Sequence, residues 1–537
     1  MWTTPLWSPP QDLSPAEEKI AARAAKKKKL FVFLREIRTE LFDPAFQEEL
    51  VGRYRQTGAG KPPVPPALLA MATLLQAYTG VSDQEAVELT LDSTRWQFVL
   101  AGLGSEAPLF SQGALFDFRM RLMNTGMDQR LLERTVELAR TRGGFDGKTL
   151  RLALDSSPLW GHGRVEDTFN LLGHAAHQVI ACLAELTRHE VAHVIEQIGL
   201  SLFEGPSLKA ALDIDWGDAE QKQQALQRLC DELDALQTWI REHVPVEIKQ
   251  PPLAAAVETL QTLIAQDLEP DPTNGGGTRI REGVAKNRQS SIEDQEMRHG
   301  RKSATNRFDG YKRHLARDID EQLILAAETL PANTPDTAGV DPLLVAVELQ
   351  RREVTSLHID RRYLGAELIR VYDQAGVAIV CKPWPVHPPK GHFSKLDFQI
   401  DLVTLQATCP AGQVIPIALG KTAHFPTDGC RGCALREHCT ARKSGGRSLA
   451  IHPQEDLLQR LRVLPTTAEG RAALRERVAV EHGLAHVSQR QGNRARYNGT
   501  RKNTCHLRLV SAIQNLERAQ AFSEQAQSYE IPQRLAA

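Results

Sequence analysis

The order of strand-like and helix-like segments constrains the fold of this chain more than any other feature. A short strand pattern at Leu150–Leu154 is followed by a long, mostly helical stretch at Val179–Asp267. Further strand patterns come only later, at Arg307–His314, Leu323–Glu328, Ser356–Ile359 and Val377–Cys381, with a helix expected at Ala366–Ala375. Strands with interleaved helices are typical of an α/β core. We therefore predict an α/β core that a helical insertion interrupts.

The residues before the first strand pattern are expected to form helices. Apolar residues recur at helical spacing over Leu30–Tyr54, with an interruption near Pro44. Ser82 and Glu85 have the spacing of a capping box, and Ser111 begins another amphipathic segment. A helix-turn-helix element that binds DNA and a helical bundle that dimerises both fit this pattern.

These patterns divide the 537 residues into two predicted domains. Residues 1–145 would form a helical N-terminal domain for DNA binding or dimerisation. Residues 146–537 would form the α/β domain, with a helical insertion at residues 179–278 and a cysteine-rich insertion at residues 405–445.

Charge is distributed unevenly, although the formal net charge is only −1. Residues 213–271 carry 13 Asp and Glu against 4 Lys and Arg, whereas residues 279–317 carry 11 Lys and Arg against 5 Asp and Glu. A second block rich in arginine spans residues 431–518. Basic blocks are usually solvated surfaces, but two of them beside candidate catalytic acids favour a partner with a phosphate backbone.

The sequence contains no run of eighteen apolar residues and no signal-peptide pattern. We therefore expect no membrane span and a location in the cytoplasm.

Three acidic residues have the placement that phosphoryl transfer would need. Asp155 and Asp360 each follow a strand-like segment, and Glu481 is expected in the middle of a helix. Arg477 precedes Glu481 by about one helical turn, so these two side chains share a helix face. Carboxylates from distant parts of a chain can hold two Mg²⁺ ions about 3.5–4 Å apart. From the residues alone, turn-forming aspartates and a surface ion pair are the alternative interpretation.

The helix that carries Glu481 has its own sequence signals. Thr466 and Glu469 have capping-box spacing and are expected to open the helix. The helical pattern then runs to about Gln491.

Four segments resemble those of bacterial insertion-sequence DDE transposases, whose catalytic domain is RNase H-like. In this chain, the segment LALDSSPLWGHGRVEDTFNLLGHA resembles the family's region of the first catalytic aspartate. The segment MRHGRKSATNRFDGYKRHLARD resembles the strand pair that follows it in the family. The segment LHIDRRYLGAELIRVYDQAGVAIVCKPWP resembles the family's region of the second catalytic aspartate. The segment GRAALRERVAVEHGLAHVSQRQGNRARYNGTRKN resembles the family's glutamate helix and the basic tail after it. The resemblance covers roughly residues 30 to 516, with the segments in family order.

This resemblance implies an RNase H-like core with Asp155, Asp360 and Glu481 as catalytic residues and ligands of two Mg²⁺ or Mn²⁺ ions. The implied function is a DNA transposase that cleaves the ends of its own insertion sequence and joins them to target DNA. The implied partners are the terminal inverted repeats, the target DNA and a second copy of the chain on the paired ends. The alternatives are a different RNase H-like nuclease and a catalytically silent or domesticated DNA-binding protein.

The glutamate helix departs from the family pattern at two positions. Related transposases often carry a Tyr, Arg, Glu, Lys signature there, and this chain has Leu474, Arg477, Glu481 and Ser488. We consider Arg490 as a replacement for the missing lysine. The three acids are intact, so the sequence gives no reason to regard the active site as dead.

A basic tail follows the glutamate helix. Residues 489–503 contain few apolar side chains, so their cations are expected to be exposed and to contact the DNA backbone. A solvated tail is the alternative. The predicted DNA-binding residues are Arg477, Arg490, Arg494, Arg496, Arg501 and Lys502.

Four of the eight cysteines lie within thirty-one residues. They have the spacing C-x20-C-x2-C-x5-C, and a C-x2-C pair supplies two of the four soft ligands that tetrahedral zinc prefers. We predict a structural zinc site, with unligated thiols as the alternative. Four thiolates leave no open position, so this site would not be catalytic. The predicted ligands are Cys409, Cys430, Cys433 and Cys439.

Overall fold

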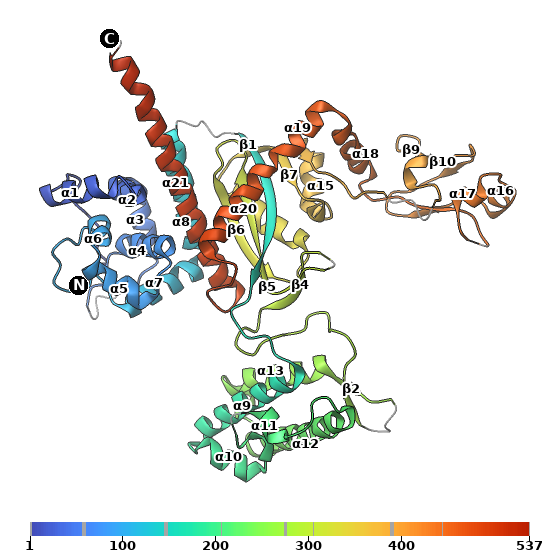
Figure 1. The fold of residues 1–537 in the computed structure, drawn as a ribbon, viewed down its shortest axis with the longest axis horizontal. Coiled ribbons are helices and arrows are strands. Elements are labelled where there is room, and N and C mark those ends of the chain that lie inside the picture. The colour runs from blue at the N-terminus through green and yellow to red at the C-terminus, as the bar shows by residue number, and fades with distance from the viewer. Residues whose placement is uncertain are drawn as a thin grey trace.

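A computed structural model describes residues 3–55, 61–143, 149–205, 207–272, 277–303, 305–386, 391–442 and 444–535. The predicted domain boundary between residues 145 and 146 and the chain end at residue 537 lie outside these ranges. The fold is mixed α/β, with a helical N-terminal region followed by sheets and helices (Figure 1).

The N-terminal region contains helices, as the sequence predicted. The capping box of Ser82 and Glu85 is present, and Ser111 caps the helix that it was expected to begin. The helices are α1 Pro15–Ala24, α2 Lys29–Leu41, α3 Pro44–Val51, α4 Pro66–Thr79, α5 Asp83–Asp92, α6 Thr94–Leu100, α7 Gln112–Thr125 and α8 Met127–Gly143.

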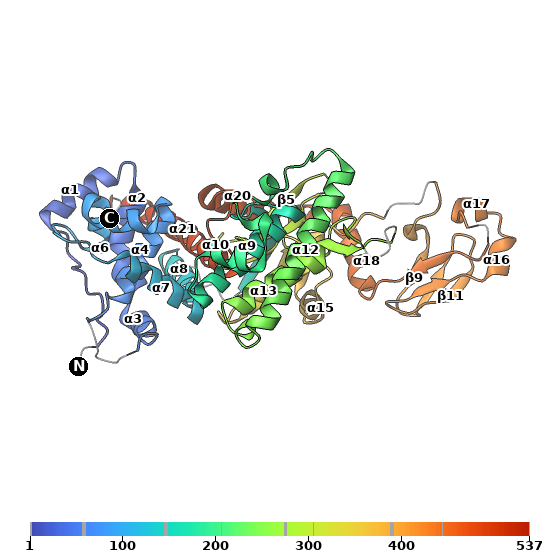
Figure 2. The same ribbon diagram turned by 90° about the horizontal axis from the view of Figure 1, so that it is seen from below.

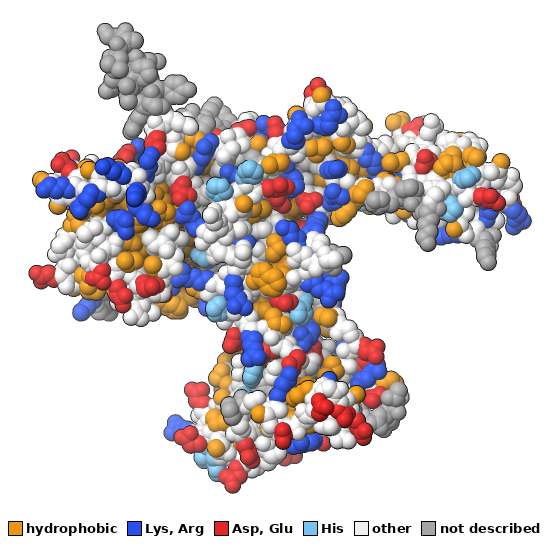
Figure 3. All heavy atoms as spheres, in the orientation of Figure 1, with side chains coloured by type: hydrophobic (Ala, Val, Ile, Leu, Met, Phe, Trp, Pro, Cys, Tyr) orange, Lys and Arg blue, Asp and Glu red, His pale blue; other side chains and the backbone are white. Residues whose placement is uncertain are grey.

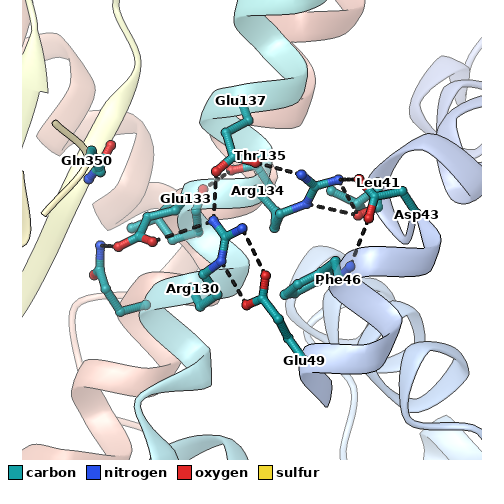
Figure 4. A network of polar contacts seen from close by, with 12 residues as sticks. Leu41, Asp43, Phe46, Glu49, Arg130, Glu133, Arg134, Thr135, Glu137 and Gln350 are labelled. Carbon is teal, nitrogen blue, oxygen red and sulfur yellow. Dashed lines mark hydrogen bonds and ion pairs between the residues drawn. The ribbon is translucent and has the colours of Figure 1, made fainter. Parts of the chain in front are cut away.

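Ion pairs connect helix α8 to helix α3 within this region (Figure 4). Arg130 reaches Glu49 at 3.0 Å, and Arg134 reaches Asp43 at 2.6 Å. Both guanidinium groups also lie over the ring of Phe46. Because these side chains are partly exposed, the ion pairs add little to the free energy of unfolding. We infer that the apolar core provides most of the stability and that the ion pairs set the orientation of the two helices.

A six-stranded sheet forms the centre of the molecule. Strand β1 lies in its middle, antiparallel to β5 and parallel to β7, and β5 pairs in turn with β4 and β6. The predicted strand at Leu150–Leu154 is therefore real but longer, since β1 runs on past Asp155 and pairs Trp160 with Gly310. The strands are β1 Thr149–Trp160, β4 Arg298–Arg301, β5 Arg307–Asp318, β6 Ile324–Pro331, β7 Glu353–Ile359 and β8 Ala378–Val380.

Helices cover both faces of this sheet. Leu152 and Leu154 point to the face packed by α14 (Val340–Glu348) and α15 (Glu367–Gln374). Side chains alternate along a strand, so Ala153 and Asp155 point to the opposite face. That face is packed by α20 (Val478–Gln491) and α21 (Thr500–Leu535). Helix α21 also packs against α8 and α4, which joins the sheet to the N-terminal helices.

Two further units project from the sheet (Figures 1 and 2). The helical unit between β1 and β5 has an apolar core of its own, and its first helix begins at Thr168, before the predicted start at residue 179. Its elements are α9 Thr168–Thr187, α10 Val191–Ile198, α11 Leu208–Leu212, α12 Ala219–His243, α13 Leu253–Asp267, β2 Leu268–Pro270 and β3 Thr278–Ile280.

The cysteine-rich unit lies at the far end of the molecule from the N-terminal helices (Figure 2). A small apolar core that includes Phe398 and Ile451 extends beyond the predicted bounds of 405–445 on both sides. The elements are β9 Gln399–Asp401, β10 Gln406–Thr408, β11 Val414–Pro416, β12 Thr422–His424, α16 Thr427–Arg431, α17 Arg436–Cys439 and β13 Ser448–Ala450.

The predicted helix around Glu481 is two helices rather than one. After α18 (Glu455–Val463), the chain forms α19 (Ala468–Glu476), breaks at Arg477 and continues as α20. The predicted cap was also wrong by one residue, because Thr467 rather than Thr466 accepts from the Gly470 backbone N–H. Short 3-10 helices occupy Ser201–Phe203, Glu247–Lys249, Asp336–Gly339, Arg361–Tyr363, Lys395–Asp397 and Leu464–Thr466.

Among the residues that the model describes, no helix combines the length and the apolar character needed to cross a bilayer.

Candidate active site

Strand register brings the two predicted aspartates together. Strands β1 and β7 are parallel neighbours, and Leu154 pairs with Ile359. The next residues are Asp155, which is still within β1, and Asp360, which directly follows β7, so the two carboxyl groups come together where β7 ends. The expectation that Asp155 ends a strand was wrong, because β1 continues for five more residues beside β5.

Helix α20 brings the third carboxylate to the same place. Val480 packs against Ala153 and Ile319 on the sheet, which fixes the neighbouring Glu481 at the edge of that contact. Gly483 allows this close approach, because a Cβ there would lie 2.4 Å from a guanidinium nitrogen of Arg317. Glu481 lies in the first turn of α20 rather than in mid-helix, and half of its side chain is exposed.

Arg477 stands between two of the three acids. Its guanidinium group donates to Glu481 Oε1 at 2.6 Å and lies 3.4 Å from Asp155 Oδ2. The shared face predicted for Arg477 and Glu481 is thus confirmed, and contact with Asp155 is an addition. Arg477 lies at the break between α19 and α20, so the break places its side chain in the site.

Burial changes the acidity of Asp155. Only 13% of its side chain is exposed, and this burial raises the pKa of the carboxyl group to about 6. The Arg477 charge and the Ser156 backbone N–H, which donates at 2.8 Å, oppose the rise, while the charges of Asp360 and Glu481 add to it. Such coupling shows that the three acids share one electrostatic environment.

All three acids line one cleft of about 530 Å³. Its walls also contain four cations that the sequence did not single out. Arg301 and Lys302 lie at the β4–β5 turn and are exposed, whereas Lys312 and Arg362 pair with the buried Asp336. Three of the four belong to the basic block at residues 279–317, which the sequence showed only as a whole, and Arg362 lies outside it. The additional cations are Arg301, Lys302, Lys312 and Arg362.

A buried polar group supports the strand beneath Asp155. The fully buried Tyr363 hydroxyl lies 3.0 Å from His314 Nδ1 and beside the Ser156 side chain. Burial and the nearby Asp155 charge hold the pKa of Tyr363 well above its ordinary value, so the phenol stays protonated. This residue positions β1 rather than exchanging protons.

Most cations of the predicted basic tail contact the protein itself, so the expectation of an exposed tail was wrong for them. Arg496 donates to the Gly80 carbonyl at 3.1 Å. Arg501 forms two 2.7 Å bonds to the buried Asp128. Arg494 is exposed but donates to Gly161 O at 3.1 Å, and Lys502 is exposed.

Arg490 does not replace the signature lysine at the carboxylate cleft. Its guanidinium group is 2.5 Å from Glu517 and lies over the ring of Tyr78, in a different cleft. Ser488, one of the two departures from the family pattern, lines the carboxylate cleft instead.

The four clustered cysteines line one cavity of about 470 Å³ in the cysteine-rich unit. The Gln413 backbone N–H donates to Cys409 Sγ at 3.3 Å. Burial and the neighbouring sulfurs raise the pKa of Cys439. Within the described ranges, no three His, Cys, Asp or Glu side chains converge closely enough to form a metal-binding group, either here or at the three carboxylates.

Comparisons with known proteins identify the class. A family model described as "Transposase DDE domain" matches residues 408–520, and one described as "Transposase domain (DUF772)" matches residues 19–121. Both models describe transposase domains, and they support the family that the sequence resemblance indicated, the insertion-sequence DDE transposases. The first match includes Glu481 and the cysteines but reaches neither aspartate. No curated protein and no solved structure matches the chain.

Proposed function

We propose that this transposase cleaves the ends of its own insertion sequence and joins them to target DNA, with Asp155, Asp360 and Glu481 as the catalytic carboxylates. The observation that carries the proposal is the convergence of these three acids in one cleft from two parallel strands and a helix. The strand order supports an RNase H-like core, because the first strand is central, pairs antiparallel with β5 on one side and parallel with β7 on the other, and β5 pairs antiparallel with β6.

DDE transposases generally use divalent metal ions, and the donor set here suits Mg²⁺ or Mn²⁺. All three side chains offer only oxygen ligands, which hard cations prefer. The positive charge of Arg477 between Asp155 and Glu481 indicates that a cation is favoured at this position. Two bound ions would supply activation of the attacking oxygen and stabilisation of the leaving oxygen.

The residues of the chain have their own tasks in this proposal. Asp155, Asp360 and Glu481 would hold the metal ions, and the buried Asp155 would do so in its deprotonated form. Arg301 and Lys302 are exposed at the cleft and are free of acidic partners within the described part of the chain, so they can hold backbone phosphates. Of the predicted DNA-binding residues, Arg494 and Lys502 are exposed and are proposed for the same role, whereas Arg477 is held by Asp155 and Glu481.

Double-stranded DNA is the partner that a transposase implies, and we propose a homodimer on paired transposon ends. The rival proposal, a silent or domesticated DNA-binding protein, gains no support from the residues of the cleft. We also propose that Cys409, Cys430, Cys433 and Cys439 hold a structural zinc ion, since their thiols line a single cavity.

Substitution of the acids tests the function. Asp360→Asn and Glu481→Gln should each reduce Mn²⁺-dependent DNA cleavage by at least a hundredfold while DNA binding stays within about twofold, because a metal-binding charge is lost and the shape is kept. Glu476→Gln, one helix earlier, is the matched control. Near-wild-type cleavage by either variant would contradict the assignment of that residue.

A further inference from the structure

A second basic cleft, of about 410 Å³, lies between the N-terminal helices and the helix of Glu481. Lys28 and Phe31 at the start of α2, Tyr78 at the end of α4 and Arg95 in α6 form one side. Helices α20 and α21 form the other side. The cleft therefore joins the two regions that the two transposase models match separately.

The floor of this cleft is a row of cations and aromatic rings in contact. Arg95 lies over the ring of Phe31, with 5.6 Å from its guanidinium carbon to the ring centroid. The rings of Phe31 and Tyr78 meet edge to face at 5.4 Å, and Arg490 lies 5.2 Å from the centroid of Tyr78. Stacking on rings fixes flexible arginine side chains in place.

The charge of the cleft is positive. Glu517 pairs with Arg490, and Lys29 beside the cleft pairs with Glu524. Over the described ranges, Lys28 and Arg95 have no acidic group within 4 Å, and both are exposed. Blue side chains cover the surface over α1 and α2 next to this position in Figure 3. The exposed cations Arg23, Lys26 and Lys27 belong to this stretch.

Helix α20 is a ridge between the carboxylate cleft and the basic cleft. Glu481, Ala485 and Ser488 line the first, whereas His486, Gln489 and Arg490 line the second. At 3.6 residues per turn, these two faces of the helix adjoin, and the buried stripe with Val480 and Val487 lies behind both. A single polymer that lies across α20 therefore reaches both clefts.

We propose that double-stranded DNA entering the carboxylate cleft continues across α20 into the basic cleft, where Lys28 and Arg95 hold its backbone phosphates. This inference rests on the proposed function. DNA is favoured over an acidic protein because the phosphate backbone is continuous, and one molecule can then occupy both clefts. The contacts are to phosphates rather than base edges, so they hold the flank of the cleavage site without regard to its sequence.

The test is the salt dependence of binding to a fluorescent duplex of mixed sequence. Lys28→Ala/Arg95→Ala should weaken binding at least tenfold at low salt and reduce the slope of log K against log salt by about two, at roughly 0.9 per phosphate contact. Lys28→Glu alone, at an exposed position whose side chain caps no helix, should also weaken binding. Arg241→Ala/Lys249→Ala, which removes two exposed cations from the helical unit, is the matched control and should change neither quantity.

The outcomes separate this inference from the proposed function. If the wild type shows no metal-dependent cleavage of any duplex, the proposed function fails whatever the binding slope. If the wild type cleaves but Lys28→Ala/Arg95→Ala keeps the wild-type slope and affinity, the proposed DNA path is overturned. Competition by poly-glutamate as effective as that by DNA would assign the cleft to an acidic protein and would also overturn it.

Discussion

Asp155→Asn should make the metal-free protein more stable at neutral pH, even though it removes a proposed catalytic group. Burial raises the pKa of this carboxyl from its ordinary 3.8 to about 6 in the folded protein. A difference of this size corresponds to about 3 kcal/mol, at roughly 1.4 kcal/mol for each pH unit. Because only 13% of the side chain is exposed, solvent screening removes little of this energy.

The sign follows from the two states. Between pH 4 and pH 6, Asp155 ionises in the unfolded chain but keeps its proton in the folded one, so the folded state loses stability as the pH rises. Above about pH 6, both states are ionised and the loss is complete. Asparagine cannot ionise, so its advantage over the wild type should grow from below pH 4 to above pH 6 by up to about 3 kcal/mol.

Urea unfolding in the presence of a chelator measures this difference at several pH values. The comparison uses the change of the difference with pH, so any fixed effect of the asparagine on packing cancels. Glu258→Gln, which removes one charge from an exposed position on α13, should show a small, nearly constant difference. A difference between Asp155→Asn and wild type that stayed constant or shrank from pH 4 to pH 7 would refute the reasoning.

Three further predictions concern the framework of the protein. Arg501→Ala should lower the free energy of unfolding by roughly 2 kcal/mol, because it leaves the buried Asp128 with Arg508 as its remaining partner, and denaturant titration would reveal the loss. Gly310→Ala should lower the melting temperature by many degrees, because Gly310 has φ +145° and a Cβ there would lie 2.2 Å from the Gly161 nitrogen. Gly113→Ala, in open space on α7, should leave the melting temperature unchanged or slightly higher. Cys430→Ser should lower both the zinc content and the melting temperature of purified protein, and reduced wild-type protein without zinc would count against the zinc site.

Local patterns in the sequence were sufficient for most of the secondary structure. Capping side chains such as Ser82 and Ser111 act over three residues, so the start of a helix can be predicted from its own sequence. The strand at Ser356–Ile359 before Asp360 was also predictable, because a strand pattern is read from neighbouring residues. The break at Arg477 was not, because helical periodicity continues through it.

The family and its candidate acids came from segments along the chain, but their convergence depends on tertiary structure. Only the register of β1 beside β7 puts Asp155 next to Asp360, and only the packing of α20 on the sheet brings Glu481 to them. Burial, which raises the pKa of Asp155, is also a property of the assembled core.

The basic tail shows the limit of sequence reasoning most clearly. Composition correctly predicted that residues 489–503 form no core of their own, and from this we expected exposed cations. The partners of Arg496 and Arg501 are Gly80 and Asp128, more than 370 residues away, so no local pattern could indicate them. Sequence by itself determined the class and the local elements, whereas the tertiary structure decided which charges face solvent, because long-range contacts alone determine burial.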